Sequence, residues 1–116
     1  MEQKGWRDIP IGGMILDAGN AVEYRTGDWR AFRPVHGEAD CTHCFQCWLF
    51  CPDSSILVDK ENEKMIGFDL DHCKGCGICA AICPVNAKVI KKAGEELDRD
   101  DPRLCIRIIE EGKVQE

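Results

Sequence analysis

The stretch that decides the fold is "CTHCFQCWLFCP", residues 41–52, which places four cysteines within twelve positions. Two residues separate the first cysteine from the second and the second from the third, whereas three residues separate the third from the fourth, which a proline follows. The same run recurs as "CKGCGICAAICP", residues 73–84, with every cysteine and the proline offset by 32 positions. An internal repeat of this kind predicts two pseudo-symmetric halves within one small domain.

The spacing indicates how the thiols are shared. A C-x-x-C-x-x-C segment can coil so that three thiolates converge on one iron–sulfur cubane, with backbone N–H groups turned toward the sulfurs. The next three residues favour a helical turn, and the proline holds the fourth cysteine in extended backbone, away from that loop. In bacterial two-cluster ferredoxins with this run, the fourth cysteine ligates the other cluster.

We therefore predict two [4Fe–4S] clusters with crossed ligands. The predicted ligands of the first cluster are Cys41, Cys44, Cys47 and Cys83. The predicted ligands of the second cluster are Cys73, Cys76, Cys79 and Cys51.

Zinc binding and disulfide formation are two alternative roles for the cysteines. A pair of Cys₄ zinc sites is an alternative, but zinc sites usually consist of separated CxxC pairs and not of three cysteines in one loop. A disulfide scaffold would need an oxidising compartment, and the N-terminus "MEQKGWRDIP" has no basic start followed by an apolar run, as a signal peptide would. We expect a cytoplasmic protein with reduced thiols.

The sequence predicts an α+β fold in three zones: an extended, turn-rich arm (1–40), a two-cluster ferredoxin domain (41–92) and a charged tail (93–116). Each repeat ends in a β-prone piece, at 56–58 and 88–90, and the alternation of Ile66, Phe68 and Leu70 indicates a half-buried strand. In the tail, "DDPRLCIRIIEEG" (100–112) favours a short helix, although a strand fits nearly as well.

The two cysteine loops differ in composition. Gly75 and Gly77 in the second loop permit positive φ angles, whereas the first loop has His43, Phe45 and Gln46. We expect the clusters to differ in N–H···S bonding and solvent access, and hence in potential.

Four further residues have predicted roles. His43 is predicted to be a packing or surface histidine, because thiolates already fill the cluster's ligand positions. Trp48 and Phe50 are expected to cover a cluster, and Cys105 to be a free, partly buried thiol.

Charge and composition exclude several functions. The net charge of −6 argues against nucleic acid as a partner, and no apolar stretch approaches the length of about 20 residues that a membrane helix needs. The sequence contains no catalytic constellation and no phosphate-binding loop, and clusters ligated fully by cysteine leave no open iron. These features predict a low-potential electron carrier without a substrate site of its own.

The segment before the cysteine runs indicates a more specific function than that of a general electron carrier. "IPIGGMILDAGNAVEYRTGDWRAFRP" (9–34), followed by the paired runs, resembles the delta subunits of the pyruvate:ferredoxin oxidoreductases (pyruvate synthases), within the 2-oxoacid:acceptor oxidoreductase family. The resemblance covers roughly residues 9–92. Many ferredoxins share the cysteine runs, so the arm is the discriminating part.

The resemblance implies a complex with alpha, beta and gamma subunits. Thiamine diphosphate and Mg²⁺ would lie on those partners, coenzyme A would take the acyl group, and the clusters would relay single electrons to a soluble ferredoxin. The arm, including Trp29 and Arg30, would dock on the partner subunits. The alternatives are a free two-cluster ferredoxin, a zinc-stabilised interaction module, or the delta subunit of a branched-chain 2-oxoacid or 2-oxoglutarate oxidoreductase.

Overall fold

A computed structural model describes residues 3–113 of the chain, which form an α+β structure as predicted. The α-helices are α1 (Gln46–Phe50), α2 (Ile78–Ile82) and α3 (Pro84–Ala93). The strands are β1 (Phe32–His36), β2 (Ile56–Asp59), β3 (Lys64–Phe68) and β4 (Ile106–Glu110). Short 3-10 helices lie at Ile11–Gly13, Asn20–Glu23, Thr26–Trp29, Glu38–Asp40 and Glu111–Lys113.

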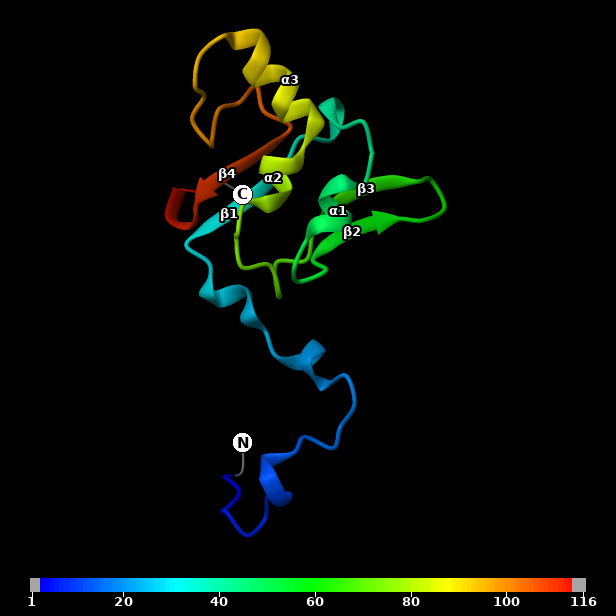
Figure 1. Cartoon of the computed structure of the whole chain (residues 1–116), viewed down its shortest axis with the longest axis vertical. Coiled ribbons are helices and arrows are strands. Elements are labelled where there is room, and N and C mark those ends of the chain that lie inside the picture. The colour runs from blue at the N-terminus through cyan, green and yellow to red at the C-terminus, as the bar shows by residue number, and fades with distance from the viewer. Residues whose placement is uncertain (1–2, 114–116) are drawn as a thin grey trace.

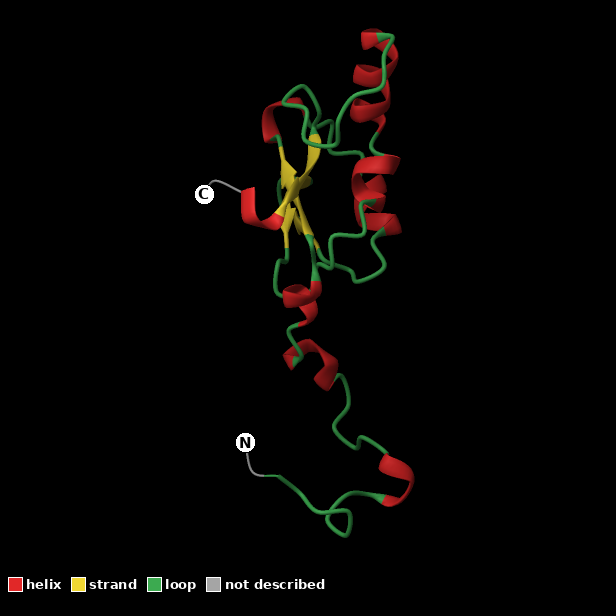
Figure 2. Cartoon of the chain, turned by 90° about the vertical axis from the view of Figure 1, so that its left-hand side faces the viewer, coloured by secondary structure: helices red, strands yellow, loops and turns green. Residues whose placement is uncertain are grey.

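The strands form two antiparallel pairs, β1 with β4 and β2 with β3. The side view shows the strands on one side of the body and the long axes of α2 and α3 on the other (Figure 2). None of the helices within residues 3–113 is both long and apolar enough to cross a bilayer.

The strand predicted around residues 66–70 exists as β3, but its buried side chain differs from the prediction. Met65 is only 1% exposed, whereas Ile66 is 55% exposed. A bulge at Ile66 of β3 shifts the register between Leu57 and Val58 of β2, so that Met65 pairs with Val58. The bulge breaks the simple alternation on which the prediction depended, so Met65 and Phe68 both contact the core.

The strand predicted at residues 88–90 is wrong, because this segment lies within α3. Pro84 occupies the first turn of α3, where a missing N–H is tolerated, and Gly94 ends the helix with a φ of 65°. The two ends therefore specify a helix, against the local preference of its β-branched residues.

The helix predicted within residues 100–112 is also wrong, because residues Ile106–Glu110 form strand β4. Leu104, Ile106 and Ile108 alternate with more exposed residues and are 7%, 3% and 5% exposed. β4 pairs with β1, so that Pro34 lies opposite Ile108 and His36 opposite Ile106. This pairing joins the end of the predicted arm to the predicted tail, against the cysteine domain.

The first part of the chain extends away from this body (Figure 1). Its large apolar side chains are exposed: Trp6, Ile9, Ile11, Met14, Ile15, Leu16, Val22 and Tyr24. Near Thr26 the chain reaches the body, where the Gly27 N–H donates to the Asp71 carbonyl at 2.8 Å.

The core of the body is small and rich in cysteine. Its buried apolar members among the described residues are Cys47, Ile56, Met65, Cys79, Cys83, Leu104, Cys105, Ile106 and Ile108. So few aliphatic side chains provide little apolar burial, and small domains of this kind are usually stabilised by metal ligation. The cysteines therefore lie where a bound group would complete the core.

Candidate metal centres

The two cysteine loops have the same backbone conformation. In the second loop Gly75 and Gly77 have φ angles of 69° and 81°, as the sequence predicted. In the first loop His43 and Phe45, at the equivalent positions, have φ angles of 56° and 62°. Because side chains with a Cβ disfavour this region by roughly 1 kcal/mol or more, the first loop adopts the shared conformation at a cost that the second avoids.

Each loop leads into a short helix that carries the third cysteine inward. Phe45 precedes α1 and Gly77 precedes α2, and the third cysteines, Cys47 and Cys79, are both buried. The fourth cysteines, Cys51 and Cys83, end these helices in extended backbone, with ψ angles of 117° and 119°. The following prolines favour this conformation, so each fourth thiol leaves its own loop.

The eight cysteines of the two runs line two separate cavities. The thiols at the first cavity are Cys41, Cys44, Cys47 and Cys83. The thiols at the second cavity are Cys51, Cys73, Cys76 and Cys79. Each cavity thus combines three cysteines of one run with the fourth cysteine of the other.

Burial disfavours the charged form of these thiols. Desolvation raises the pKa of Cys47 and Cys73 and raises the pKa of Cys79 to about 12. Thiolates at these positions therefore need a bound cation, which iron would supply. Backbone N–H groups also point at sulfur, as Ser55 N does at Cys51 Sγ (3.2 Å) and His43 N at Cys41 Sγ (3.3 Å).

A fifth thiol lies at the first cavity. Cys105, from the segment before β4, is 1% exposed and lines this cavity beside the four predicted ligands. Its Sγ lies within 4.8 Å of potential ligand atoms of His36 and Cys41. Burial raises the pKa of the Cys105 thiol to about 12, so it is protonated at neutral pH. The sequence predicted a free thiol but not its position, which depends on the pairing of β1 with β4.

Asn86 holds Cys105 in this position, a role that no motif or spacing in the sequence predicts. Its Oδ1 accepts hydrogen bonds from the N–H groups of Cys105 (2.8 Å) and Ile106 (3.1 Å). Its Nδ2 donates to the carbonyls of Ala80 (3.1 Å) and Ile106 (2.9 Å). One buried amide thus ties β4 to α2 and α3.

The predictions for His43, Trp48 and Phe50, in the first loop and α1, differ in how well the structure agrees with them. His43 Nδ1 accepts a hydrogen bond from Met65 N at 3.0 Å, so this histidine packs against β3. Trp48 and Phe50, which were expected to cover a cluster, are 51% and 52% exposed. They point largely to solvent and do not seal the cavity.

Arg30 was expected to dock on a partner, and this expectation is wrong. Its side chain is only 8% exposed and forms an ion pair and hydrogen bonds within the chain. The Nη1 atom donates to the carbonyls of Leu70 (2.5 Å), Gly27 (2.9 Å) and Cys73 (3.2 Å). The neighbouring Trp29 remains 63% exposed, with Lys74 over its ring at 5.6 Å.

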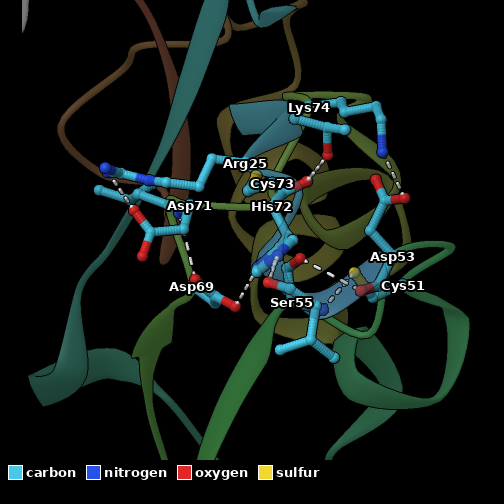
Figure 3. Close-up of polar contacts among 12 residues, drawn as sticks. Arg25, Cys51, Asp53, Ser55, Asp69, Asp71, His72, Cys73 and Lys74 are labelled. Carbon is cyan, nitrogen blue, oxygen red and sulfur yellow. Dashed lines mark hydrogen bonds and ion pairs between the residues drawn. The ribbon is translucent and has the colours of Figure 1, made fainter. Parts of the chain in front are cut away.

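Polar contacts surround the second loop and attach the arm to it (Figure 3). Arg25 pairs with Asp71 at 2.6 Å, and Lys74 pairs with Asp53 at 2.7 Å. His72 contacts Asp69 through Nδ1 and the Val22 carbonyl through Nε2, both at 2.8 Å. The hydrogen bond with Asp69 is the main reason that the pKa of His72 is raised.

Comparison with known proteins identifies this arrangement. Residues 35–91 match the 4Fe-4S dicluster domain family. The pyruvate synthase subunit PorD of Thermotoga maritima is 45% identical over 86% of this chain and 99% of its own length. The subunit of the same name from Methanocaldococcus jannaschii is 42% identical over 76% of this chain and 98% of its own length.

A relative from another enzyme matches less of the chain. The ketoisovalerate oxidoreductase subunit VorD of Pyrococcus furiosus is 42% identical over 52% of this chain and 55% of its own length. A dicluster domain implies two [4Fe–4S] clusters, and the two cavities, each lined by four cysteines of the two runs, fit that number. The chain belongs to the family of pyruvate synthase delta subunits and carries a 4Fe-4S dicluster domain for electron transfer.

Proposed function

We propose that this chain relays electrons from the catalytic subunits of a pyruvate:ferredoxin oxidoreductase to a soluble ferredoxin. Its partners would be alpha, beta and gamma subunits, which would bind thiamine diphosphate and Mg²⁺ and transfer the acyl group to coenzyme A. Each cluster, when bound, accepts and releases one electron at a time. This chain contributes the conducting path and no substrate site.

The proposal includes crossed ligation. Cys41, Cys44, Cys47 and Cys83 would hold the first cluster, and Cys73, Cys76, Cys79 and Cys51 the second. The observation that carries it is the grouping of the thiols, since each cavity is lined by three cysteines of one run and the fourth of the other. The shared positive φ angles of the two loops support equivalent binding at both cavities.

The arm supports assembly with larger partners. Its apolar side chains between Trp6 and Tyr24 are 49% to 98% exposed, which is unfavourable unless another surface covers them. We propose that this part of the arm, together with Trp29, packs on the partner subunits. Arg30 has no part in this contact, because its side chain is committed inside the chain.

The nine unpaired cysteines suit a reducing compartment, so we place the complex in the cytoplasm. A branched-chain or 2-oxoglutarate oxidoreductase is the second candidate, because the VorD relative is 42% identical over 52% of this chain. Pyruvate is favoured, because the pyruvate synthase relatives match up to 86% of this chain, including most of the arm.

The proposal is tested by isolating the native assembly without oxygen. We expect co-purification with three larger chains, about eight iron and eight sulfide per delta chain, and CoA-dependent reduction of ferredoxin with pyruvate in preference to other 2-oxoacids. A monodisperse, uncomplexed chain with the same iron content would favour a free ferredoxin. A colourless preparation containing zinc would overturn the proposal.

A further inference from the structure

The second cavity has a buried positive charge beside it. The Arg30 guanidinium donates to the backbone carbonyl of Cys73, a predicted ligand, and to Leu70, just before the second loop. A Cβ added to Gly75 would lie 3.3 Å from the Cβ of Arg30. The first carbon of the arginine side chain therefore lies next to the backbone of this loop. The charge is therefore held against the backbone of Cys73, which lines the second cavity.

Charged side chains do not line the first cavity among the described residues. Its lining among the described residues is cysteine, Thr42, Phe45, Met65, Pro84, Val85 and Ile106, without a charged side chain. The second cavity is also lined by Asp53 and Lys74, but these two form an ion pair at 2.7 Å, so their charges largely cancel. Arg30 differs from these two residues, because its side chain is only 8% exposed and it shares its carboxylate partner with Arg33.

Arg30 shares its counter-charge with a second arginine. Glu111 Oε2 lies 3.3 Å from Arg30 Nε, and the same carboxylate pairs with Arg33 Nη2 at 2.7 Å. One carboxylate therefore contacts two guanidinium groups. Glu111 is also 35% exposed against 8% for Arg30, so water screens the negative charge more strongly.

We propose that Arg30 selectively raises the midpoint potential of the second cluster, through a charge that the arm places against the second loop. This inference rests on the proposed binding of two [4Fe–4S] clusters and adds a residue that sets the properties of one of them. Uptake of one electron from an external reductant adds one negative charge to a four-thiolate site, and no bond is broken. A nearby buried cation stabilises that added charge more strongly than a solvent-exposed one would.

The test is an EPR-monitored redox titration of the full chain with both clusters bound. Arg30→Gln removes the charge and should shift the midpoint of the second cluster to more negative potential, with the first unchanged. Glu111→Gln removes the counter-charge and should shift the same midpoint in the opposite direction. Lys113→Gln is the matched control, because it removes a cation that is 75% exposed and paired with Glu110, and should move neither midpoint.

Cys51→Ser identifies the signal of the second cluster, because it alters or removes that cluster alone. A purely structural role for Arg30 would make both the Arg30 and the Glu111 variants lose iron, and would not give opposite shifts. If Arg30→Gln does not retain clusters, the Glu111→Gln shift alone decides.

The inference is overturned if Arg30→Gln leaves the second midpoint in place with both clusters bound, or if Glu111→Gln lowers it. It is also overturned if both clusters shift equally. Wild-type chain without two cubanes by iron and sulfide analysis would instead contradict the proposed function, so the two failures are distinguishable.

Discussion

The two cysteine loops reach one backbone conformation from different residues and then rest on different parts of the chain. The second loop uses glycine at both positive-φ positions and packs against the arm, at Gly27, Arg30 and Phe32. The first loop uses histidine and phenylalanine and lies beside Cys105 and Ile106, just before and at the start of β4. The repeat thus fixes the shape of the two sites, whereas the segments added at its ends make their surroundings unequal.

The largest expected effect comes from Gly75→Ala, which should break the second site alone. A Cβ there would overlap the Phe32 carbonyl and would occupy a φ of 69°. We expect destabilisation by roughly 3 kcal/mol or more and loss of about half of the iron. Iron analysis and urea unfolding under anaerobic conditions measure this. Normal iron content in the variant would contradict the close contact between the arm and the loop.

Asn86→Ala should affect the first site instead. Removal of four hydrogen bonds leaves buried backbone groups without partners, at a cost of about 2 to 4 kcal/mol. As β4 loosens, Cys105 should react with a thiol reagent that does not label it in the wild-type chain. The control is Asn62→Ala, in the exposed turn between β2 and β3, which should leave Cys105 protected. Equal labelling in both variants would argue against the role of Asn86.

Gly77→Ala sharpens the comparison of the loops themselves. Its φ is 81°, but a Cβ there would meet no atom within 4 Å. We therefore expect the free energy of unfolding to fall by about 1 kcal/mol, from backbone strain alone. Phe45 has a similar positive φ at the equivalent position of the first loop. Both clusters should be retained, as iron analysis would show. A loss of iron as large as that for Gly75→Ala would mean that positive φ, and not contact with the arm, separates the two glycines.

A smaller effect, on stability as a function of pH, is expected at Glu111, whose carboxylate pairs with Arg30 and Arg33. Hydrogen bonds from Arg33, and then from Arg30, hold the pKa of Glu111 below its ordinary value. Because the folded pKa is lower than the unfolded one, the stabilisation is complete above the unfolded pKa and is lost as pH falls through the folded pKa.

Glu111→Gln should therefore lose its clusters about two- to fivefold faster than wild type in urea at pH near 7. The ratio of the two rates should begin to fall below about pH 4.3, the ordinary pKa of a glutamate. It should approach one only below the lowered pKa of the folded state, where the wild-type carboxylate becomes protonated. Visible absorbance follows cluster loss in both chains. A ratio that does not change with pH would contradict the ion-pair account.

The sequence was sufficient for features that depend on short-range spacing. The α+β class, the repeat and the positive φ of Gly75 and Gly77 all follow from local residue order, whereas iron binding in the crossed arrangement stays a prediction. Features decided by distant contacts were missed. Ile106–Glu110 fits helix and strand periods alike, and only the free edge of β1 selects the strand.

Local sequence patterns also could not predict which side chains contact backbone that is distant in the sequence. Arg30 follows an exposed tryptophan in a turn-rich arm, and nothing in the sequence indicates that its guanidinium faces inward to the carbonyls of Leu70 and Cys73. Cys105 reaches the first cavity only because β4 pairs with β1 and Asn86 anchors it. Both residues act across separations that no periodicity encodes.

Iron-edge anomalous diffraction from crystals of the anaerobically purified protein tests the shared sites most directly. We expect two iron cubes, one bonded to the sulfurs of Cys41, Cys44, Cys47 and Cys83, and the other to those of Cys73, Cys76, Cys79 and Cys51. A cube bonded to Cys51 together with the first three cysteines of its own run, or single metal ions in place of cubes, would contradict it.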